Sequence, residues 1–178
     1  PFPPAERYLK AITSNPSVLQ RIMVEGEPRE IAMISTAFWK LNIQQHGNFF
    51  TALSGKDVIN RIVNTGSIQS ISNIATSFAK LKVLNHHDYF TALNDEIIVK
   101  KIVNINDGNI QEIANIATSF STLKFQDYKN FFGAISNEEV SRYIVNSGNT
   151  QAIANIATAY AHLDIYDHVV YFNAINDK

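Results

Sequence analysis

Residues 71–81 read ISNIATSFAKL, and three further stretches of the chain repeat this pattern almost position for position. The related stretches are IAMISTAFWKL from Ile31, IANIATSFSTL from Ile113 and IANIATAYAHL from Ile153. Successive copies therefore begin 40, 42 and 40 residues apart. Self-similarity at a period of about 40 residues is typical of helical-repeat proteins, so one repeating unit determines the fold.

The apolar residues of one copy recur at helical spacing. They share one side of an α-helix and do not fit the alternation of a strand; in the second copy they are Ile71, Ile74, Ala75, Phe78 and Leu81. We expect this first helix of the repeat, helix A, to span about residues 67–82 of the second copy.

A second recurring segment follows each copy and predicts a second helix, helix B. It begins with an aromatic pair, in FFTAL from Phe49, YFTAL from Tyr89, FFGAI from Phe131 and YFNAI from Tyr171. An apolar-basic segment comes next, as in VINRIV from Val58. In the second copy helix B is expected over about 86–104. We expect a break near Ser54, Asn94 and Ser136, because Ser136 followed by Glu139 fits a capping box.

A glycine follows each helix B. These glycines are Gly26, Gly66, Gly108 and Gly148, and we expect them to form left-handed C-caps. The longer third spacing arises because IVNTG in one copy becomes IVNINDG in the next. The insertion precedes Gly108, where a loop between two helices accommodates extra residues.

These patterns predict an all-α fold, an α-solenoid of tandem helix-turn-helix repeats of about 40 residues. Residues 1–178 are expected to form one array with a partial repeat at each end. The expected boundaries are 1–26, 27–66, 67–108, 109–148 and 149–178. The partial repeats predict that a longer parent chain supplies neighbouring repeats on both sides.

Composition argues against several function classes. The chain has no cysteine, which excludes disulfides, thiol catalysis and thiolate metal sites and fits a reducing intracellular compartment. No window has the roughly 20 apolar residues that a membrane span needs, and the first residues show neither an initiator Met nor a signal-peptide pattern. The net charge of −1 lacks the basic excess common in nucleic-acid-binding domains, so any such function depends on where the charges lie.

No catalytic or metal-binding constellation is visible. G-x-S-x-G, GxxxxGK[ST] and HExxH are absent from the sequence. His46, His86 and His168 share one repeat register, so whole repeats separate them and a shared metal is not expected. The carboxylates of Asp95–Glu96 and Glu138–Glu139 fall at expected helix starts, where the helix dipole explains them. We expect no enzyme, cofactor or small-molecule substrate.

A polar row lies opposite the apolar side of helix A. In chain order it comprises Arg29, Met33, Thr36, Lys40; Gln69, Asn73, Thr76, Lys80; Gln111, Asn115, Thr118, Thr122; and Gln151, Asn155, Thr158, His162. Solvated helix surfaces normally favour Glu and Lys, whereas amides suit base edges, sugars or peptide backbone. Two structural alternatives remain: the Asn residues form a hydrogen-bond ladder between repeats, or the Thr residues bond to their own helix.

A column of cations recurs on helix B. Arg21, Arg61 and Lys101 occupy one register, and Arg142 lies one place earlier in its copy. One cation per repeat would track phosphates along a bound strand. The alternative is a solvated face on which each cation pairs with a nearby acid.

The runs Asn73–Thr76, Asn115–Thr118 and Asn155–Thr158, each followed by an aromatic-rich helix, resemble the octotricopeptide repeat family. Related heptatricopeptide and RAP-associated repeats share this likeness. It covers essentially the whole chain, although the first copy departs at Met33. The chain does not look like a tetratricopeptide array, because that family's Trp-Leu-Gly-Tyr signature is missing.

The resemblance implies an α-solenoid that binds single-stranded RNA at about one base per repeat. Two sets of variable positions are then candidates for base choice: Glu30, Ser70, Glu112 and Ala152, and Lys40, Lys80, Thr122 and His162. The recurring Gln and Asn would hold the sugar or backbone. It also implies action in mitochondria or chloroplasts, or in the host cytoplasm or nucleus for a secreted bacterial effector. The alternative partner is a protein, since the charge is near neutral and the helices are rich in Phe and Tyr.

Overall fold

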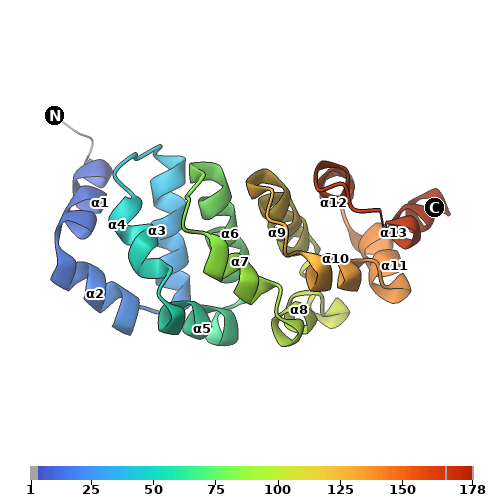
Figure 1. The fold of residues 1–178 in the computed structure, drawn as a ribbon, viewed down its shortest axis with the longest axis horizontal. Helices are drawn as coiled ribbons and strands as arrows, with labels where there is room; N and C mark the ends of the chain where they lie inside the picture. The colour runs from blue at the N-terminus through green and yellow to red at the C-terminus, as the bar shows by residue number, and fades with distance from the viewer. Residues whose placement is uncertain (1–3, 167, 178) are drawn as a thin grey trace. The chain divides into compact units, whose positions relative to one another are not determined.

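The computed structural model describes residues 4–166 and 168–177 and is helical throughout, with no strand in these segments (Figure 1). The α-helices are α1 (Pro4–Ser14), α2 (Pro16–Glu25), α3 (Pro28–Lys40), α4 (Gly47–Leu53), α5 (Lys56–Thr65), α6 (Ile68–Leu81), α7 (His87–Leu93), α8 (Glu96–Ile102), α9 (Ile110–Leu123), α10 (Lys129–Ile135), α11 (Glu138–Ser147), α12 (Thr150–His162) and α13 (Val169–Asn176). One 3-10 turn, η1 (Ile105–Asp107), is formed by the inserted loop before Gly108. The all-α prediction is confirmed.

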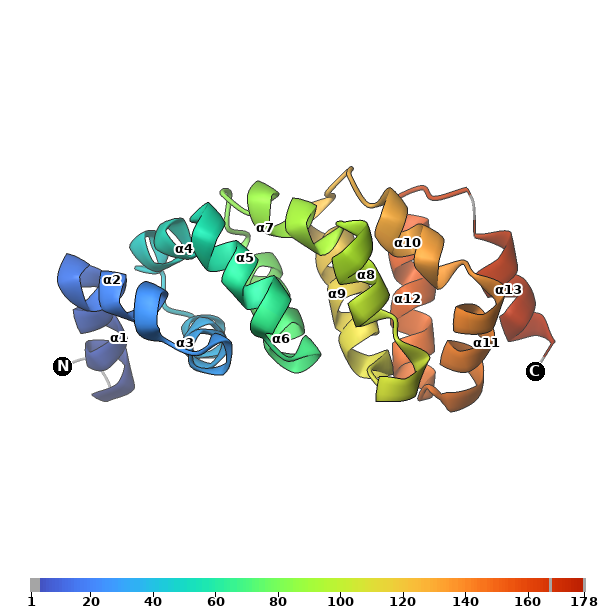
Figure 2. The same cartoon turned by 90° about the horizontal axis from the view of Figure 1, so that it is seen from below.

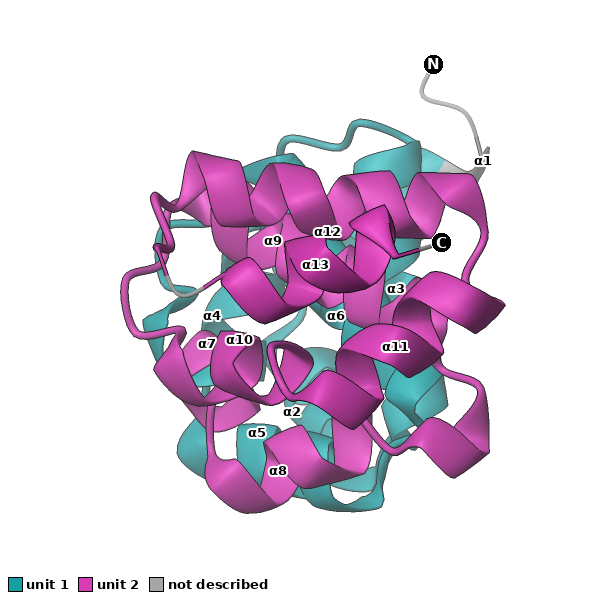
Figure 3. Cartoon of the chain, turned by 90° about the vertical axis from the view of Figure 1, so that its right-hand side faces the viewer, with its two compact units in different colours: residues 1–89 teal, residues 90–178 magenta. Residues whose placement is uncertain are grey.

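The chain divides into two compact units, residues 1–89 and residues 90–178 (Figure 3). In unit 1, the helix A segments α3 and α6 pack side by side, and α4 packs on α1 and α2. In unit 2, α9 packs along α12, while α10 contacts α8 and α11. Both pairs of A helices are visible as neighbours in two views (Figure 1; Figure 2).

Each complete helix B is two short helices, as the sequence predicted. The break separates α4 from α5, α7 from α8 and α10 from α11. The capping residue differs from the one expected at Ser136. Asn137 caps α11, and its side chain accepts hydrogen bonds from the backbone N–H groups of Glu139 and Val140. Ser136 instead lies at the end of α10, with its hydroxyl 2.8 Å from the Tyr160 hydroxyl.

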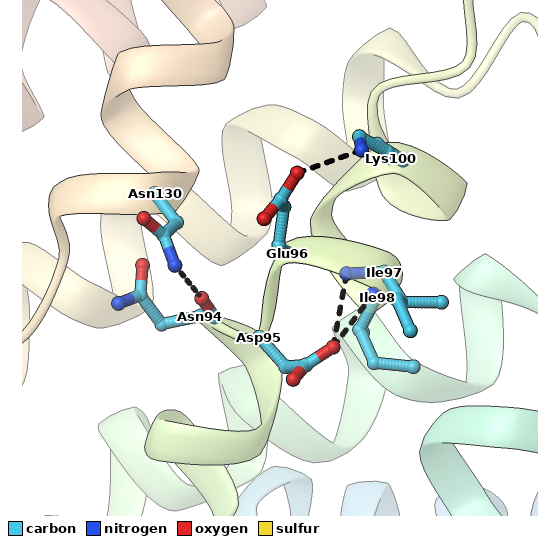
Figure 4. A network of polar contacts seen from close by, with 7 residues as sticks. All are labelled: Asn94, Asp95, Glu96, Ile97, Ile98, Lys100 and Asn130. Carbon is cyan, nitrogen blue, oxygen red and sulfur yellow. Dashed lines mark hydrogen bonds and ion pairs between the residues drawn. The ribbon is translucent and has the colours of Figure 1, made fainter.

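Polar groups at these breaks connect one repeat to the next. Asn94 is buried, and its Oδ1 accepts a hydrogen bond from the Phe131 N–H at 2.9 Å. Its carbonyl accepts from Asn130 Nδ2, also at 2.9 Å, while Asp95 caps α8 beside it (Figure 4). In unit 1 the Ser54 hydroxyl donates to the Asn85 carbonyl at 2.8 Å. Side chains at the break therefore bond to backbone groups of the following repeat, and the Asn94 carbonyl accepts from one of its side chains.

Aromatic rings connect the repeats within the core of each unit. In every repeat the aromatic of helix A meets the first ring of helix B; the Phe78–Tyr89 and Phe120–Phe131 centroids are both 5.2 Å apart. The second ring of helix B then contacts helix A of the next repeat. Centroid distances for these pairs are 4.9 Å for Phe50–Phe78, 5.1 Å for Phe90–Phe120 and 5.1 Å for Phe132–Tyr160.

The expected left-handed glycine caps are wrong at three of the four positions. Gly26, Gly66 and Gly148 have extended backbones, with φ between −75° and −65°, and only Gly108 has a positive φ, of 68°. Glycine is needed at these three positions because a Cβ would clash with neighbouring atoms. A Cβ on Gly66 would lie 2.5 Å from the Ile62 carbonyl oxygen and 3.1 Å from Pro28. Gly148 is similarly close to its own helix and to Ile110.

The left-handed caps are found instead just past helix A, on residues with side chains. Positive φ values of 51° to 53° occur at Asn42, Lys82, Lys124 and Asp164. The N–H that follows each of these residues returns to a carbonyl five residues back, as Val83 does to Phe78 at 3.0 Å. This is the Schellman arrangement, in which an apolar residue follows the left-handed one. Buried Ile43, Val83 and Phe125 fill that role.

Candidate ligand-binding face of the A helices

The polar row predicted on helix A begins with an exposed glutamine in three repeats. Gln69, Gln111 and Gln151 lie in the first turn of α6, α9 and α12 and are exposed to solvent. Their helices bury the opposite side in the aromatic core. Arg29 occupies the matching position of α3 and is also exposed.

An asparagine follows each glutamine one turn later. Asn73, Asn115 and Asn155 are half-buried, so each amide is partly enclosed and still reachable from solvent. In α9, Gln111 Nε2 donates a hydrogen bond to Asn115 Oδ1 at 3.2 Å. The first repeat has Met33 here instead, a large apolar side chain with 63% of its surface exposed.

Two threonines of the row bond to their own helices, which is one of the structural alternatives considered from the sequence. The hydroxyls of Thr118 and Thr158 donate to the carbonyls of Ala114 and Ala154, both at 2.8 Å. The Thr76 hydroxyl is buried and has no hydrogen-bond partner in the described part of the chain. The ligand-facing chemistry of the row is therefore that of the amides.

The last position of the row is exposed in all four repeats. Lys40, Lys80, Thr122 and His162 occupy the final turn of α3, α6, α9 and α12. The helix dipole favours cations at this end. Lys40 Nζ also lies 5.7 Å from the centre of the neighbouring Trp39 ring. Within each unit these side chains add a chemically variable position at the end of the helix that carries the amides.

The other set of variable positions is mostly withdrawn from solvent. Ser70 and Ala152 are only 4% and 1% exposed, so neither presents surface to a ligand. Glu112 is half-buried. Glu30 is exposed, but its carboxylate accepts the Glu27 N–H at 3.0 Å in a capping box that starts α3. We therefore leave Ser70 and Ala152 out of the binding face and assign Glu30 to the start of its helix.

The cations of helix B do not share one environment. The Arg61 guanidinium donates to the backbone carbonyls of Met23 and Gly26, at the end of α2, and so caps the preceding repeat. Arg142 pairs with Glu138 at 2.8 Å on the exposed surface of α11. Burial lowers the pKa of Lys101, which is half-buried, whereas Arg21 is exposed. These four side chains therefore do not form a uniform column of cations for phosphate contacts.

A residue that sequence reasoning missed connects two repeats on the amide face. Asn149 caps α12 and its Nδ2 donates to Gln111 Oε1 of α9 at 3.4 Å. A cap is readable from the Asn-Thr-Gln order at 149–151, but its reach to the preceding repeat depends on how α9 and α12 pack. This inter-repeat hydrogen bond comes from the cap and Gln111, and not from the Asn residues of the row for which the ladder was considered.

Unit 2 also contains an apolar groove away from the amide row. It has a volume of about 500 Å³ and is lined by α8, α10 and the segment after α12, including Val99, Phe132 and Tyr166. Gly133 faces open space there, since a Cβ on it would meet nothing within 4 Å. The equivalent position in other repeats is Thr51, Thr91 or Asn173. The ion pair of Glu96 with Lys100 lies at its edge (Figure 4).

Comparison with protein-family models, with curated proteins and with solved structures finds no match to this chain. Among the described residues, no helix combines the length and the hydrophobicity needed to cross a bilayer. No three His, Cys, Asp or Glu residues of the same segments converge on a site for a metal ion.

Proposed function

We propose that the chain is part of an α-solenoid that binds single-stranded RNA through the amide row of its A helices, at about one base per repeat. The proposal includes membership of the octotricopeptide repeat group or its relatives, and it assigns the chain no catalytic role. The recurrence of an exposed Gln one turn before a half-buried Asn supports it most. This pair recurs on α6, α9 and α12, and within unit 2 two of these helices are packed neighbours.

The chemistry of an amide row suits unstacked bases. Amides carry both donors and acceptors, so they pair with the polar edges of bases or with 2′-hydroxyls. The exposed cations Arg29, Lys40 and Lys80 lie on the same side of α3 and α6 and would attract the phosphates. Arg21, Lys101 and Arg142 are weaker phosphate candidates, and Arg61 is engaged by backbone carbonyls.

The test is binding of pooled fluorescent single-stranded RNA, followed by anisotropy at low and raised salt. The double substitution Gln111→Ala with Asn115→Ala is expected to weaken binding about tenfold, because it removes side chains worth about one hydrogen bond each. Added salt is expected to weaken binding further. The matched control, Gln126→Ala with Asn146→Ala, removes two exposed amides of unit 2 outside the row. A wild-type chain that retains no RNA at low salt overturns the proposal.

Protein binding is the second candidate, and the apolar groove of unit 2 favours it. Tyr166 is 85% exposed at its edge, and exposed aromatic side chains are common anchors of protein interfaces. A partner that stays bound after nuclease treatment and is lost on Tyr166→Ala would assign the chain to this class.

A further inference from the structure

Three amides in unit 2 are connected end to end. Asn149, Gln111 and Asn115, here called the amide triad, come from the cap of α12 and the first two turns of α9. Asn149 Nδ2 donates to Gln111 Oε1 at 3.4 Å, and Gln111 Nε2 donates to Asn115 Oδ1 at 3.2 Å. The first amide is exposed and the last is half-buried. The triad therefore runs from a helix start to the middle of the proposed binding face.

The helix cap fixes which way every amide of the triad points. Asn149 Oδ1 accepts the backbone N–H of Ala152 at 2.8 Å, a position that only an oxygen fills, because an NH₂ group accepts no hydrogen bond. The Asn149 NH₂ must then be the group that meets Gln111, so Gln111 presents its oxygen there. The Gln111 NH₂ consequently meets Asn115, which answers with Oδ1. Reversing any amide would place two donors or two acceptors face to face.

The outcome is that Asn115 offers a donor to whatever occupies the face. Its Oδ1 already accepts a hydrogen bond from Gln111. The orientation of the triad therefore leaves the NH₂ group of Asn115 as the part of the amide that meets a ligand. The equivalent Asn73 has a different setting. Its helix α6 is capped by Ser67, whose hydroxyl accepts the Ser70 N–H and lies 3.0 Å from the Ser70 hydroxyl. A serine cap carries no amide to orient the next one.

We propose that Asn115 recognises a hydrogen-bond acceptor, the keto oxygen of uracil or guanine, and that Asn149 is the positioning residue that sets this polarity. The inference rests on the proposed RNA-binding function and specifies the base chemistry read by the third repeat. Uracil and guanine carry keto oxygens on the edges that single-stranded recognition uses. Adenine presents an amino group beside its ring-nitrogen acceptors, and bidentate pairing with it needs the amide oxygen, which in Asn115 already accepts from Gln111.

The experiment compares short oligouridylate with short oligoadenylate, because a homopolymer presents the same base to every repeat in any register. Anisotropy gives a Kd for each, and the ratio of the two Kd values is the preference. Oligoadenylate stacks on itself, so the preference is compared between variants. The wild-type chain is expected to prefer oligouridylate about tenfold.

Two substitutions separate positioning from contact. Asn149→Ser keeps a good helix cap and copies the Ser67 arrangement, so thermal unfolding is expected to stay unchanged while the preference falls to about threefold or less. Asn115→Asp keeps the size and the acceptor for Gln111 but removes the donor, so it is expected to abolish the preference. Asn73→Asp is its matched control, since it adds the same charge at the equivalent position of α6.

The outcomes distinguish the inferred base preference at Asn115 from the proposed RNA-binding function on which it rests. RNA binding in which Asn149→Ser keeps the full preference, or in which Asn115→Asp behaves like Asn73→Asp, overturns the inference and leaves the proposed function standing. A wild-type preference for oligoadenylate also overturns it. Failure of the wild-type chain to bind either homopolymer overturns both, and a partner that survives nuclease treatment would then assign the face to protein.

Discussion

The ring of Phe50 meets the ring of Phe78 edge to face, with 4.9 Å between their centroids. The two residues come from successive repeats, and both are completely buried. Aromatic pairs in this geometry contribute beyond the area they bury. Since Phe50 also contacts Phe49 of its own helix at 5.4 Å, it connects the core of one repeat to the core of the next.

Phe50→Ala is therefore expected to destabilise unit 1 by about 3–5 kcal/mol, the usual cost of emptying a buried aromatic site. Urea unfolding followed by the fluorescence of Trp39, the single tryptophan of the sequence, reports this unit. Leu84→Ala is the control, because it also removes a large apolar side chain but one that is 93% exposed. Equal losses in the two variants would show that the ring contact contributes nothing.

Two glycines of unit 2 are expected to respond oppositely to alanine. A Cβ on Gly148 would lie 2.5 Å from the Ile144 carbonyl oxygen and 3.0 Å from Ile110, so Gly148→Ala should cost about 1–3 kcal/mol through overpacking. Gly133 lies inside α10 with open space around it, so Gly133→Ala should stabilise by about 0.5–1 kcal/mol. Circular dichroism during thermal unfolding measures both. Similar shifts of the same sign would refute the steric explanation.

Two lysines near the end of α6 form a second matched pair. Lys82 has a φ of 51°, a left-handed conformation that costs a residue with a side chain about 1–2 kcal/mol. Lys82→Gly is expected to stabilise unit 1 by up to about 1 kcal/mol. Lys80 is helical and also exposed, so Lys80→Gly should destabilise by about the same amount. Denaturation midpoints that fall in both variants would contradict the assignment.

Tyr89 makes the stability of unit 1 depend on alkaline pH. Its hydroxyl donates to the Ile71 carbonyl at 2.9 Å, and burial raises the pKa of Tyr89 well above its ordinary value. The fold favours the neutral phenol, so this contribution is complete below the unfolded pKa of about 10 and is lost as the pH rises beyond it. Tyr89→Phe should cost about 1 kcal/mol at neutral pH and flatten the alkaline decline.

Urea midpoints at about pH 7 and about pH 11 give the comparison, with exposed Tyr8→Phe as control. A Tyr89→Phe variant that declines as steeply as the wild type would remove Tyr89 as the cause. Phe131 occupies the matching position of the third repeat, so a ring without the hydroxyl is already tolerated in this fold.

The sequence predicts the helices well because their signals are local. The repeat register places helix A, and polar residues at the break of helix B mark where that helix stops. The sequence pattern predicted the left-handed residues at the wrong positions because glycine serves two purposes. It adopts positive φ, and it also fits where a Cβ would clash. At Gly66 it avoids a clash with a carbonyl of its own helix, which no local pattern reveals. Lys82 accepts positive φ without any sequence signal, since the Schellman hydrogen bonds hold it.

The candidate site was predictable to the extent that helical periodicity determines exposure. Gln111 and Asn115 lie at the surface as a period of 3.6 residues requires. Ser70 directly follows an exposed Gln and is nevertheless buried, on a helix against which α3 packs. The engagement of Arg61 by the end of α2 likewise depends on packing between repeats, which a single-repeat pattern does not encode.

Because the B helices are short, those of unit 2 are expected to unfold locally only together with the helices packed against them. Helix α10 has only seven residues, far below the length at which a helix persists alone in water. Its backbone amides stay shielded from hydrogen exchange only while its neighbours remain docked, which are α8 and α11 and, through Phe131 and Phe132, α9 and α12. Deuterium uptake by α10 therefore reports separation of these helices, and α10 is expected to open together with its neighbours as one cooperative unit.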